Sequence, residues 1–234
     1  MKSAINLLMV VAGRIRQLPS LVWIFAGVLA ALFIFGQLAE EVWEREGFAW
    51  DDSILLFINS HATPSRDVFF LTITFLGAAR VMVPFTIGVF LVLLSKRKVV
   101  DALFFGLACW GAMILNLLAK ALFGRARPDL WVSPAPETTL SFPSGHAMTS
   151  MAVVAALVTL AWPTRWRWPV LIGGVLFVLT VGLSRLYLGV HFPSDVLAGW
   201  SASLVWVASV YGIVEAHQRG YLRTVHSRIT RRGV

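Results

Sequence analysis

The sequence predicts an all-α, polytopic membrane protein built as a bundle of six transmembrane helices. Of its 234 residues, 58% are hydrophobic and only 14% are charged, whereas soluble domains average roughly 45–50% and about 25%. A chain of this composition has too few polar side chains to cover a globular surface, which excludes an ordinary soluble enzyme. Apolar stretches of near-spanning length recur along the chain, separated by short charged or turn-rich segments.

Each spanning helix requires about 20 mainly apolar residues, and six stretches approach or meet this requirement. They are Leu21–Leu38, Leu76–Leu94, Ala102–Phe123, Ala147–Trp162, Pro169–Leu188 and Val196–Val214. The second stretch is interrupted by Arg80 and Pro84, so its start is the least well defined of the six. We expect the six stretches to pack into a single membrane domain that comprises residues 1–234.

The connecting segments predict the orientation of the bundle, because lysine and arginine concentrate on the cytoplasmic side of a membrane. Most of the 20 lysines and arginines fall at the two termini, at residues 96–98 and at residues 165–167. The prediction is therefore a plasma or bacterial inner membrane protein with both termini cytoplasmic. The segments 120–145 and 185–195 then face the outside or the periplasm.

The two ends of the chain and its overall charge complete this outline. Residues 1–20 are expected to form a helix at the membrane surface, with a cleaved signal peptide as the alternative, and residues 215–234 a basic cytoplasmic tail. The net charge of +8 comes from scattered residues, so no nucleic-acid partner is expected. A single cysteine, Cys109, excludes an internal disulfide and a cysteine-rich metal site.

The first of three unusual outer segments places basic residues beside the predicted end of an apolar helix. Lys120 and Arg127 are seven residues apart, about two helical turns, so a helix would bring both side chains to one side. Pro128 favours a turn or an extended chain at Arg127. These residues are either interfacial anchors that contact lipid headgroups or part of an anion site.

The second segment, Pro143-Ser144-Gly145-His146, directly precedes an apolar helix. Glycine lets backbone N–H groups approach a ligand closely, and the start of a helix favours anions. The serine hydroxyl is a further hydrogen-bond donor. The segment is therefore either a phosphate-binding helix start or a helix cap followed by an interfacial histidine.

The third segment contains Ser184-Arg185, followed after five residues by His191 and after three more by Asp195. A carboxylate near the start of the last helix can accept one imidazole N–H of His191, which leaves the other ring nitrogen free as a nucleophile or base. An ordinary buried pair is the alternative. Together the three segments supply cations, donors, two histidines and a carboxylate, and this combination indicates phosphoryl-transfer chemistry.

These three segments resemble the signature of the type 2 phosphatidic acid phosphatases, also called lipid phosphate phosphatases. That family is related to vanadium-dependent haloperoxidases and glucose-6-phosphatase. Its signature consists of lysine, six residues and Arg-Pro; then Pro-Ser-Gly-His; then Ser-Arg, five residues, histidine, three residues and aspartate. The chain contains all three parts in this order, and the resemblance extends over residues 102–214.

The resemblance implies a role for each matched residue and places the site at the extracytoplasmic interface of the helix bundle. His191 is the nucleophile that forms a phosphohistidine, Asp195 orients it, and His146 is the general acid that protonates the leaving group. The phosphate is bound by Lys120, Arg127, Arg185, Ser144 and the backbone N–H of Gly145. The family requires no divalent metal, so no cofactor and no metal site are expected.

Neighbouring polar residues outside the signature are expected to have other roles. Arg125 is predicted to contact headgroups or solvent, and the pair Asp51–Asp52 to lie on a solvated amphipathic helix together with His61. Tyr187 and Trp131 are expected to be aromatic residues of the membrane interface, although either could line a lipid entrance.

By the same resemblance, the expected function is metal-independent hydrolysis of a lipid phosphate or diphosphate from the bilayer, with no protein partner. Undecaprenyl diphosphate is the expected substrate, by analogy with compact bacterial members. Phosphatidylglycerol phosphate, phosphatidic acid and transfer of the phosphoryl group to an acceptor lipid are the alternatives. A lipid-phosphate carrier without catalytic activity would be expected to lack His146, His191 or Asp195. A haloperoxidase would be expected to be soluble.

Overall fold

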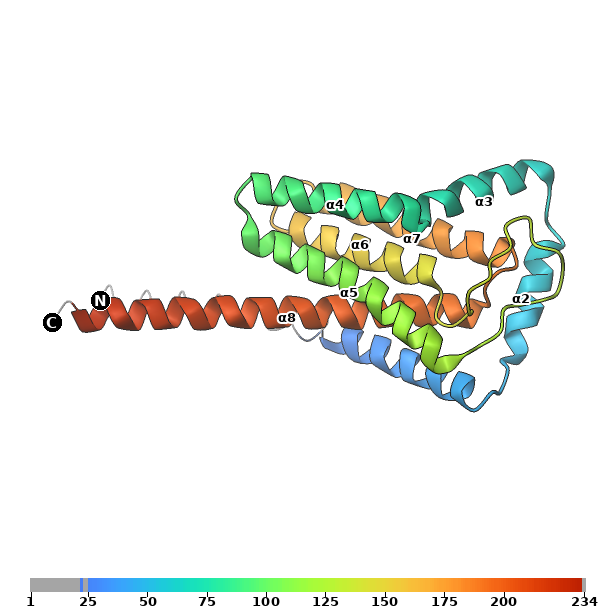
Figure 1. The fold of residues 1–234 in the computed structure, drawn as a ribbon, viewed down its shortest axis with the longest axis horizontal. Coiled ribbons are helices and arrows are strands. Elements are labelled where there is room, and N and C mark those ends of the chain that lie inside the picture. Colours follow the sequence, from blue (N-terminus) through green and yellow to red (C-terminus); the bar gives the residue numbers. More distant parts are fainter. Residues whose placement is uncertain (1–21, 23–24, 233–234) are drawn as a thin grey trace.

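A computed structural model describes residue 22 and residues 25–232, and it confirms the all-α class (Figure 1). No strand occurs within these residues. In chain order the helices are Phe25–Trp43, α2 (Ala49–Asn59), α3 (Pro64–Gly77), α4 (Ala79–Ser95), α5 (Val99–Phe123), α6 (Gly145–Ala161), α7 (Arg167–Tyr187) and α8 (Pro193–Arg232). The predicted surface helix at residues 1–20 lies outside the described residues.

The apolar helices support a multi-pass membrane protein, although their number differs from the expected six. Within the described residues, four helices are long and apolar enough to cross a membrane, or five if α3 and α4 are taken as one bent span. The apolar helix α6 has only 17 residues, somewhat short of the roughly 20 that a span requires. The count of six therefore stays a prediction.

The second expected span is divided between two helices. Its predicted start at Leu76 lies almost at the junction of α3 and α4, where the axes bend by 44°. Ala78 has extended backbone angles and ends α3, whereas Pro84 lies inside α4 without ending it. The apolar sequence is therefore continuous across the junction, but the helix is not.

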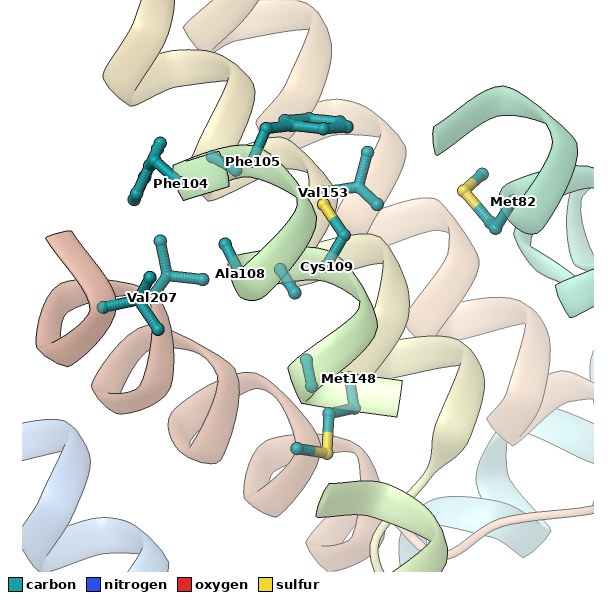
Figure 2. Packing of buried hydrophobic residues seen from close by; sticks show 12 residues of the cluster. Met82, Phe104, Phe105, Ala108, Cys109, Met148, Val153 and Val207 are labelled. Atoms are coloured by element: carbon teal, nitrogen blue, oxygen red, sulfur yellow. The ribbon is translucent and has the colours of Figure 1, made fainter. Parts of the chain in front are cut away.

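Helix α6 forms the centre of the bundle and packs against α5, α7 and α8. Figure 2 shows this core, in which Phe105 and Cys109 of α5, Met148 of α6 and Val207 of α8 pack together. Cys109 is fully buried among these side chains. A central helix surrounded on three sides holds its own N-terminal residues in a fixed position.

The outer ends of several helices meet at one end of the bundle. The last turns of α5 and α7 and the first turns of α6 and α8 lie there, together with α2 and the long segment 124–144 (Figure 1). Gly124, in the left-handed region with φ of 61°, ends α5 and redirects the chain into that segment. The basic connection 96–98 lies at the opposite end.

Helix α8 is much longer than the predicted span Val196–Val214. It begins at Pro193 and continues to Arg232, so the expected basic tail 215–234 is helical as far as residue 232. Its candidate membrane span, Pro193–Gln218, contains the predicted one. The basic C-terminal part of the helix extends from the bundle (Figure 1).

Close contact between α6 and α8 depends on Gly199, and its replacement by alanine should disturb both stability and catalysis. A Cβ atom at this position would lie 2.9 Å from the backbone oxygen of Ser144 and 3.2 Å from Cβ of Ala147. Overpacking of this kind costs about 1–3 kcal/mol. We expect Gly199→Ala to lower the apparent melting temperature in detergent and to reduce turnover.

Gly212→Ala is the matched control, because Gly212 lies on the same helix and has nothing within 4 Å of an added Cβ. This variant should melt no lower than the wild type, since alanine has the higher helix propensity. An unchanged melting temperature and turnover for Gly199→Ala would show that the two helices separate without cost.

Candidate active site

The residues singled out from the three sequence motifs lie at the end of the bundle where α5, α6, α7 and α8 meet. Lys120 comes from the last turn of α5 and Arg127 from the segment after it. Ser144, Gly145 and His146 form the start of α6. Arg185 is in the last turn of α7, His191 lies in the turn after this helix, and Asp195 is in the first turn of α8.

His191 and Asp195 form a buried pair in which the carboxylate faces one ring nitrogen. Their side chains are 1% and 0% exposed, and Nδ1 lies 3.3 Å from Oδ2 of Asp195. Ser141 donates its hydroxyl hydrogen to the same Oδ2, and the backbone N–H of Phe192 donates to it over 2.9 Å. These bonds fix the carboxylate that orients the imidazole.

The other ring nitrogen of His191 is available as an acceptor. Nε2 lies 3.1 Å from Nη1 of Arg127, and because a guanidinium group only donates, Nε2 must carry the lone pair. Burial, followed by the positive charges of Arg185 and Arg127, lowers the pKa of His191 well below its ordinary value. His191 is therefore neutral near pH 7, with its proton on Nδ1.

Two arginines direct their guanidinium groups toward one anion position. Arg185 is 1% exposed and donates to Thr74 on α3. Arg127 donates to the backbone oxygen of Val190 over 2.6 Å and to Oγ1 of Thr139 over 2.8 Å. Both also contact the carboxylate of Glu137, Arg127 over 2.7 Å.

Glu137 occupies the anion position, and the sequence analysis did not identify it. Its Oε1 contacts Arg185 and lies 3.9 Å from Nδ1 of His146, while its Oε2 pairs with Arg127. Burial alone would raise the pKa of the Glu137 carboxyl, but Arg185 and Arg127 outweigh it and lower that pKa to about 2. A permanent negative charge therefore sits where two arginines and His146 converge.

The start of α6 also offers groups to an anion. In the part of the chain that the structure describes, Oγ of Ser144 and Nε of Arg185 are buried without a hydrogen-bond partner. The turn before the helix is held by Asn116, whose amide donates to the backbone oxygen of Pro143 over 3.0 Å. A Cβ on Gly145 would lie 3.0 Å from Oδ1 of Asn116, so only glycine fits here without displacement.

Lys120 lies further from the Glu137 carboxylate than Arg127 and Arg185, which both contact it. Its ammonium group donates to the backbone oxygen of Leu140, and Arg127 also contacts that oxygen, over 3.4 Å. Lys120 therefore contacts the same segment as Arg127 and adds a positive charge to this end of the bundle.

The expectations for Arg125 and Asp51 were wrong. Arg125 was expected at headgroups or in solvent, yet its side chain is 14% exposed and forms ion pairs with Asp51 and Asp195. Asp51, expected on a solvated helix face, is 2% exposed, whereas its neighbour Asp52 is exposed. No spacing rule in the sequence distinguishes a lone arginine or aspartate that forms a buried pair from one that is solvated.

The aromatic residues near the site have structural contacts of their own. Tyr187 is buried, packs against the ring of Phe70 and donates to Oδ1 of Asp67 over 2.5 Å. The ring of Trp131 packs against Gly189, where an added Cβ atom would lie only 2.5 Å from Cζ2 of the ring. Gly189 has φ of 65°, so its backbone angle and this ring both require glycine.

The chain's relationships agree with this geometry. The family model of the PAP2 superfamily matches residues 101–219, about half of the chain. A relative, phosphatidylglycerophosphatase B of Bacillus subtilis, is 35% identical over 153 residues, which cover 63% of this chain and 74% of the relative. The chain belongs to the PAP2 superfamily. The PAP2 match contains Lys120 and every other residue singled out from the three motifs.

Two further similarities bear on this PAP2 protein. Undecaprenyl-diphosphatase of Sulfolobus acidocaldarius is 37% identical over 95 residues, 38% of this chain and 43% of the relative. The crystal structure of a transmembrane PAP2-type phosphatidylglycerolphosphate phosphatase from Bacillus subtilis superimposes with a TM-score of 0.73 at 28% identity, covering 81% of this chain and 96% of that one. The similarity therefore includes helices that precede the PAP2 match.

Replacement of Glu137 by glutamine should strengthen anion binding in this PAP2 site. An incoming anion must displace the carboxylate from Arg127 and Arg185, and the neutral amide competes less for these cations. We expect Glu137→Gln to lower the inhibition constant of orthovanadate about tenfold, or about 1.4 kcal/mol. Competition with a lipid phosphate substrate in detergent measures this constant.

Asp129→Asn removes the same charge from an exposed position of the same segment and should leave vanadate inhibition unchanged. Weaker vanadate binding by Glu137→Gln would mean that Glu137 supports the bound anion, and would contradict its role as a competitor.

Proposed function

We propose that the protein hydrolyses a lipid phosphate or diphosphate through a phosphohistidine on His191, with undecaprenyl diphosphate as the substrate. The proposal rests on one observation above all. The Glu137 carboxylate contacts both Arg127 and Arg185 and lies 3.9 Å from Nδ1 of His146. Arg127 also contacts Nε2 of His191, over 3.1 Å. The Glu137 carboxylate stands in place of phosphate oxygens.

In the first step, the lone pair of Nε2 attacks phosphorus and the bond from phosphorus to the leaving oxygen breaks. Its electron pair goes to that oxygen, and protonated His146 donates the proton that makes it a neutral leaving group. Asp195 accepts the Nδ1 hydrogen of His191 and stabilises the positive charge that develops on the ring. The products are a phosphohistidine and the released lipid.

In the second step, water replaces the lipid. His146, now neutral, removes a proton as the water oxygen bonds to phosphorus, and the N–P bond returns its electrons to His191. Orthophosphate leaves and both histidines regain their starting protonation states. The cations of Arg127, Arg185 and Lys120 stabilise the oxygen charges in both transition states.

The phosphate-binding groups include Ser144 and Gly145. The buried hydroxyl of Ser144, which has no partner among the described residues, supports a role as a donor to phosphate. The backbone N–H of Gly145 is in the first turn of α6, where N–H groups lack partners within the helix. No three His, Cys, Asp or Glu side chains of the described residues form a group that could hold a metal; independence from metals stays a prediction.

The choice of lipid rests on the relatives. One relative is named undecaprenyl-diphosphatase and another phosphatidylglycerophosphatase B, so both a diphosphate and a monoester substrate have support. Phosphatidic acid and transfer to an acceptor lipid use the same phosphoryl site. Catalytic efficiencies for the three lipids, measured in detergent with a chelator present, test the substrate, and a labelled donor distinguishes released phosphate from phosphorylated lipid.

Removal of either histidine should reduce turnover, with different consequences for the intermediate. We expect His191→Ala to abolish activity and the acid-labile phosphoprotein that the wild type accumulates. His146→Ala should reduce turnover about 10²–10⁴-fold, because it removes the general acid. Phosphate release, and labelling quenched in alkaline detergent with loss of the label on later acid treatment, measure the two effects.

His217→Ala is the control, because His217 is exposed and lies on α8 more than 20 residues after Asp195. This variant should leave both readouts unchanged. Full turnover by His191→Ala would remove the basis for the proposed nucleophile.

The proposed orientation places both termini in the cytoplasm and the active site outside. Single cysteines at Val132, which is 96% exposed near the site, and at Lys96, which is exposed at the opposite end, test it. A membrane-impermeant maleimide should label Val132→Cys in intact spheroplasts, and Lys96→Cys only after permeabilisation. The native Cys109 is fully buried and should stay unlabelled, and the reverse pattern would invert the topology.

A further inference from the structure

Arg125 lies directly behind the carboxylate that orients His191. Its Nη1 donates to Oδ1 of Asp195 over 2.7 Å and to Oγ of Ser194 over 2.7 Å. The other carboxylate oxygen, Oδ2, is the one that faces His191. Arg125 therefore contacts Asp195 on the side away from the imidazole, and it touches neither histidine in any contact of the structure.

Asp51 of α2 holds the second arm of Arg125. Its Oδ2 accepts from Nη2 of Arg125 over 2.9 Å and from the hydroxyl of Ser194 over 2.5 Å. Its Oδ1 accepts from the backbone N–H of Ser194 over 3.0 Å. This N–H belongs to the first turn of α8, where backbone donors lack intrahelical partners, so Asp51 caps the helix that carries Asp195.

The guanidinium plane is also held from its faces. Its central carbon lies 4.2 Å from the ring centroid of Phe192, the residue after His191, and 5.9 Å from that of Phe48 just before α2. A planar group with two arms and a stacked face is specific to arginine, since lysine offers a single point charge. Four side chains therefore contact one another in a row: His191, Asp195, Arg125 and Asp51.

We propose that Arg125 and Asp51 are positioning residues for the nucleophile, which act through Asp195 to hold His191 in the Nδ1–H form with Nε2 open toward the substrate. Arg125 fixes the Asp195 carboxylate in its charged state at one orientation. Asp51 fixes Arg125 and the start of α8 at the same time. The proposal rests on the proposed function, because it assigns these residues to the step in which His191 attacks phosphorus.

The other charges near His191 do not supply this function. Arg127 approaches Nε2, Arg185 and Glu137 meet at the anion position, and Lys120 points to the loop oxygen of Leu140. Among the described contacts, the ion pairs to Asp195 are those of Arg125 and His191. Loss of Arg125 therefore leaves a buried carboxylate facing only the histidine and its neutral donors.

Two variants should move the protonation of His191 in opposite directions. Arg125→Gln removes a positive charge near His191, so the charged imidazolium form is stabilised and the pKa of His191 rises. Asp51→Asn removes the negative charge that partly neutralises Arg125, so His191 loses its proton more readily. The pKa of His191 is expected to shift by about one pH unit, upward in Arg125→Gln and downward in Asp51→Asn.

The experiment measures single-turnover phosphorylation of the full-length protein in detergent, together with the titration and tautomer of ¹⁵N-labelled His191. We expect Arg125→Gln to slow phosphorylation at least tenfold and to mix the two neutral tautomers, because the released Asp195 carboxylate can turn away from Nδ1. Arg125→Lys should restore the rate only in part. Asp52→Asn, at the exposed neighbour, should match the wild type. Orthovanadate inhibition should be unchanged in every variant, because the anion position is intact.

Each outcome decides a separate point. Wild-type phosphorylation rate, titration and tautomer in Arg125→Gln would overturn the positioning role. Shifts in the same direction for Arg125→Gln and Asp51→Asn, with a lost vanadate response, would also overturn it in favour of a purely structural role. If the wild type itself forms no phosphohistidine, the proposed function fails instead, whatever the tautomer of His191.

Discussion

The active end of this protein depends on the need to neutralise positive charges that are buried against an apolar bundle. Arg185 is almost fully buried, and Arg127 points to the same place. Charges withdrawn from water require a nearby counter-charge, and in this structure Glu137 supplies it. The same requirement makes the position favourable for a phosphate, which offers more charge and more acceptor oxygens than a carboxylate.

A second set of charges lies behind His191, the proposed nucleophile. His191, Asp195, Arg125 and Asp51 follow one another in contact, so each buried group has a neighbour of complementary charge or hydrogen-bonding character. This row connects α8 to α2, a short helix that contributes few side chains to the apolar core. The contribution of α2 is therefore electrostatic as well as steric, and it explains why an outer helix is ordered against the end of the bundle.

The apolar scaffold and the polar site fix each other. Helix α6 is packed on several sides, and the absence of a side chain at Gly199 lets α8 approach it closely. At that contact the backbone N–H of Ser144 donates to the backbone oxygen of Asp195 over 3.0 Å. Two motifs that are distant in sequence are therefore joined by a backbone bond, whereas apolar side chains alone would tolerate small shifts between helices.

Local composition and spacing were enough to predict the helical membrane class, the approximate positions of the apolar helices and the three motifs at one end of the bundle. The sequence did not reveal the break at Ala78, because apolar residues and glycine continue across this position from 75 to 79 without a proline. Nor did it reveal Glu137, Arg125 or Asp51. A lone ionisable residue has the same local pattern whether it is solvated or buried, because the contacts that withdraw it from water come from segments distant in the sequence and form only when the chain folds.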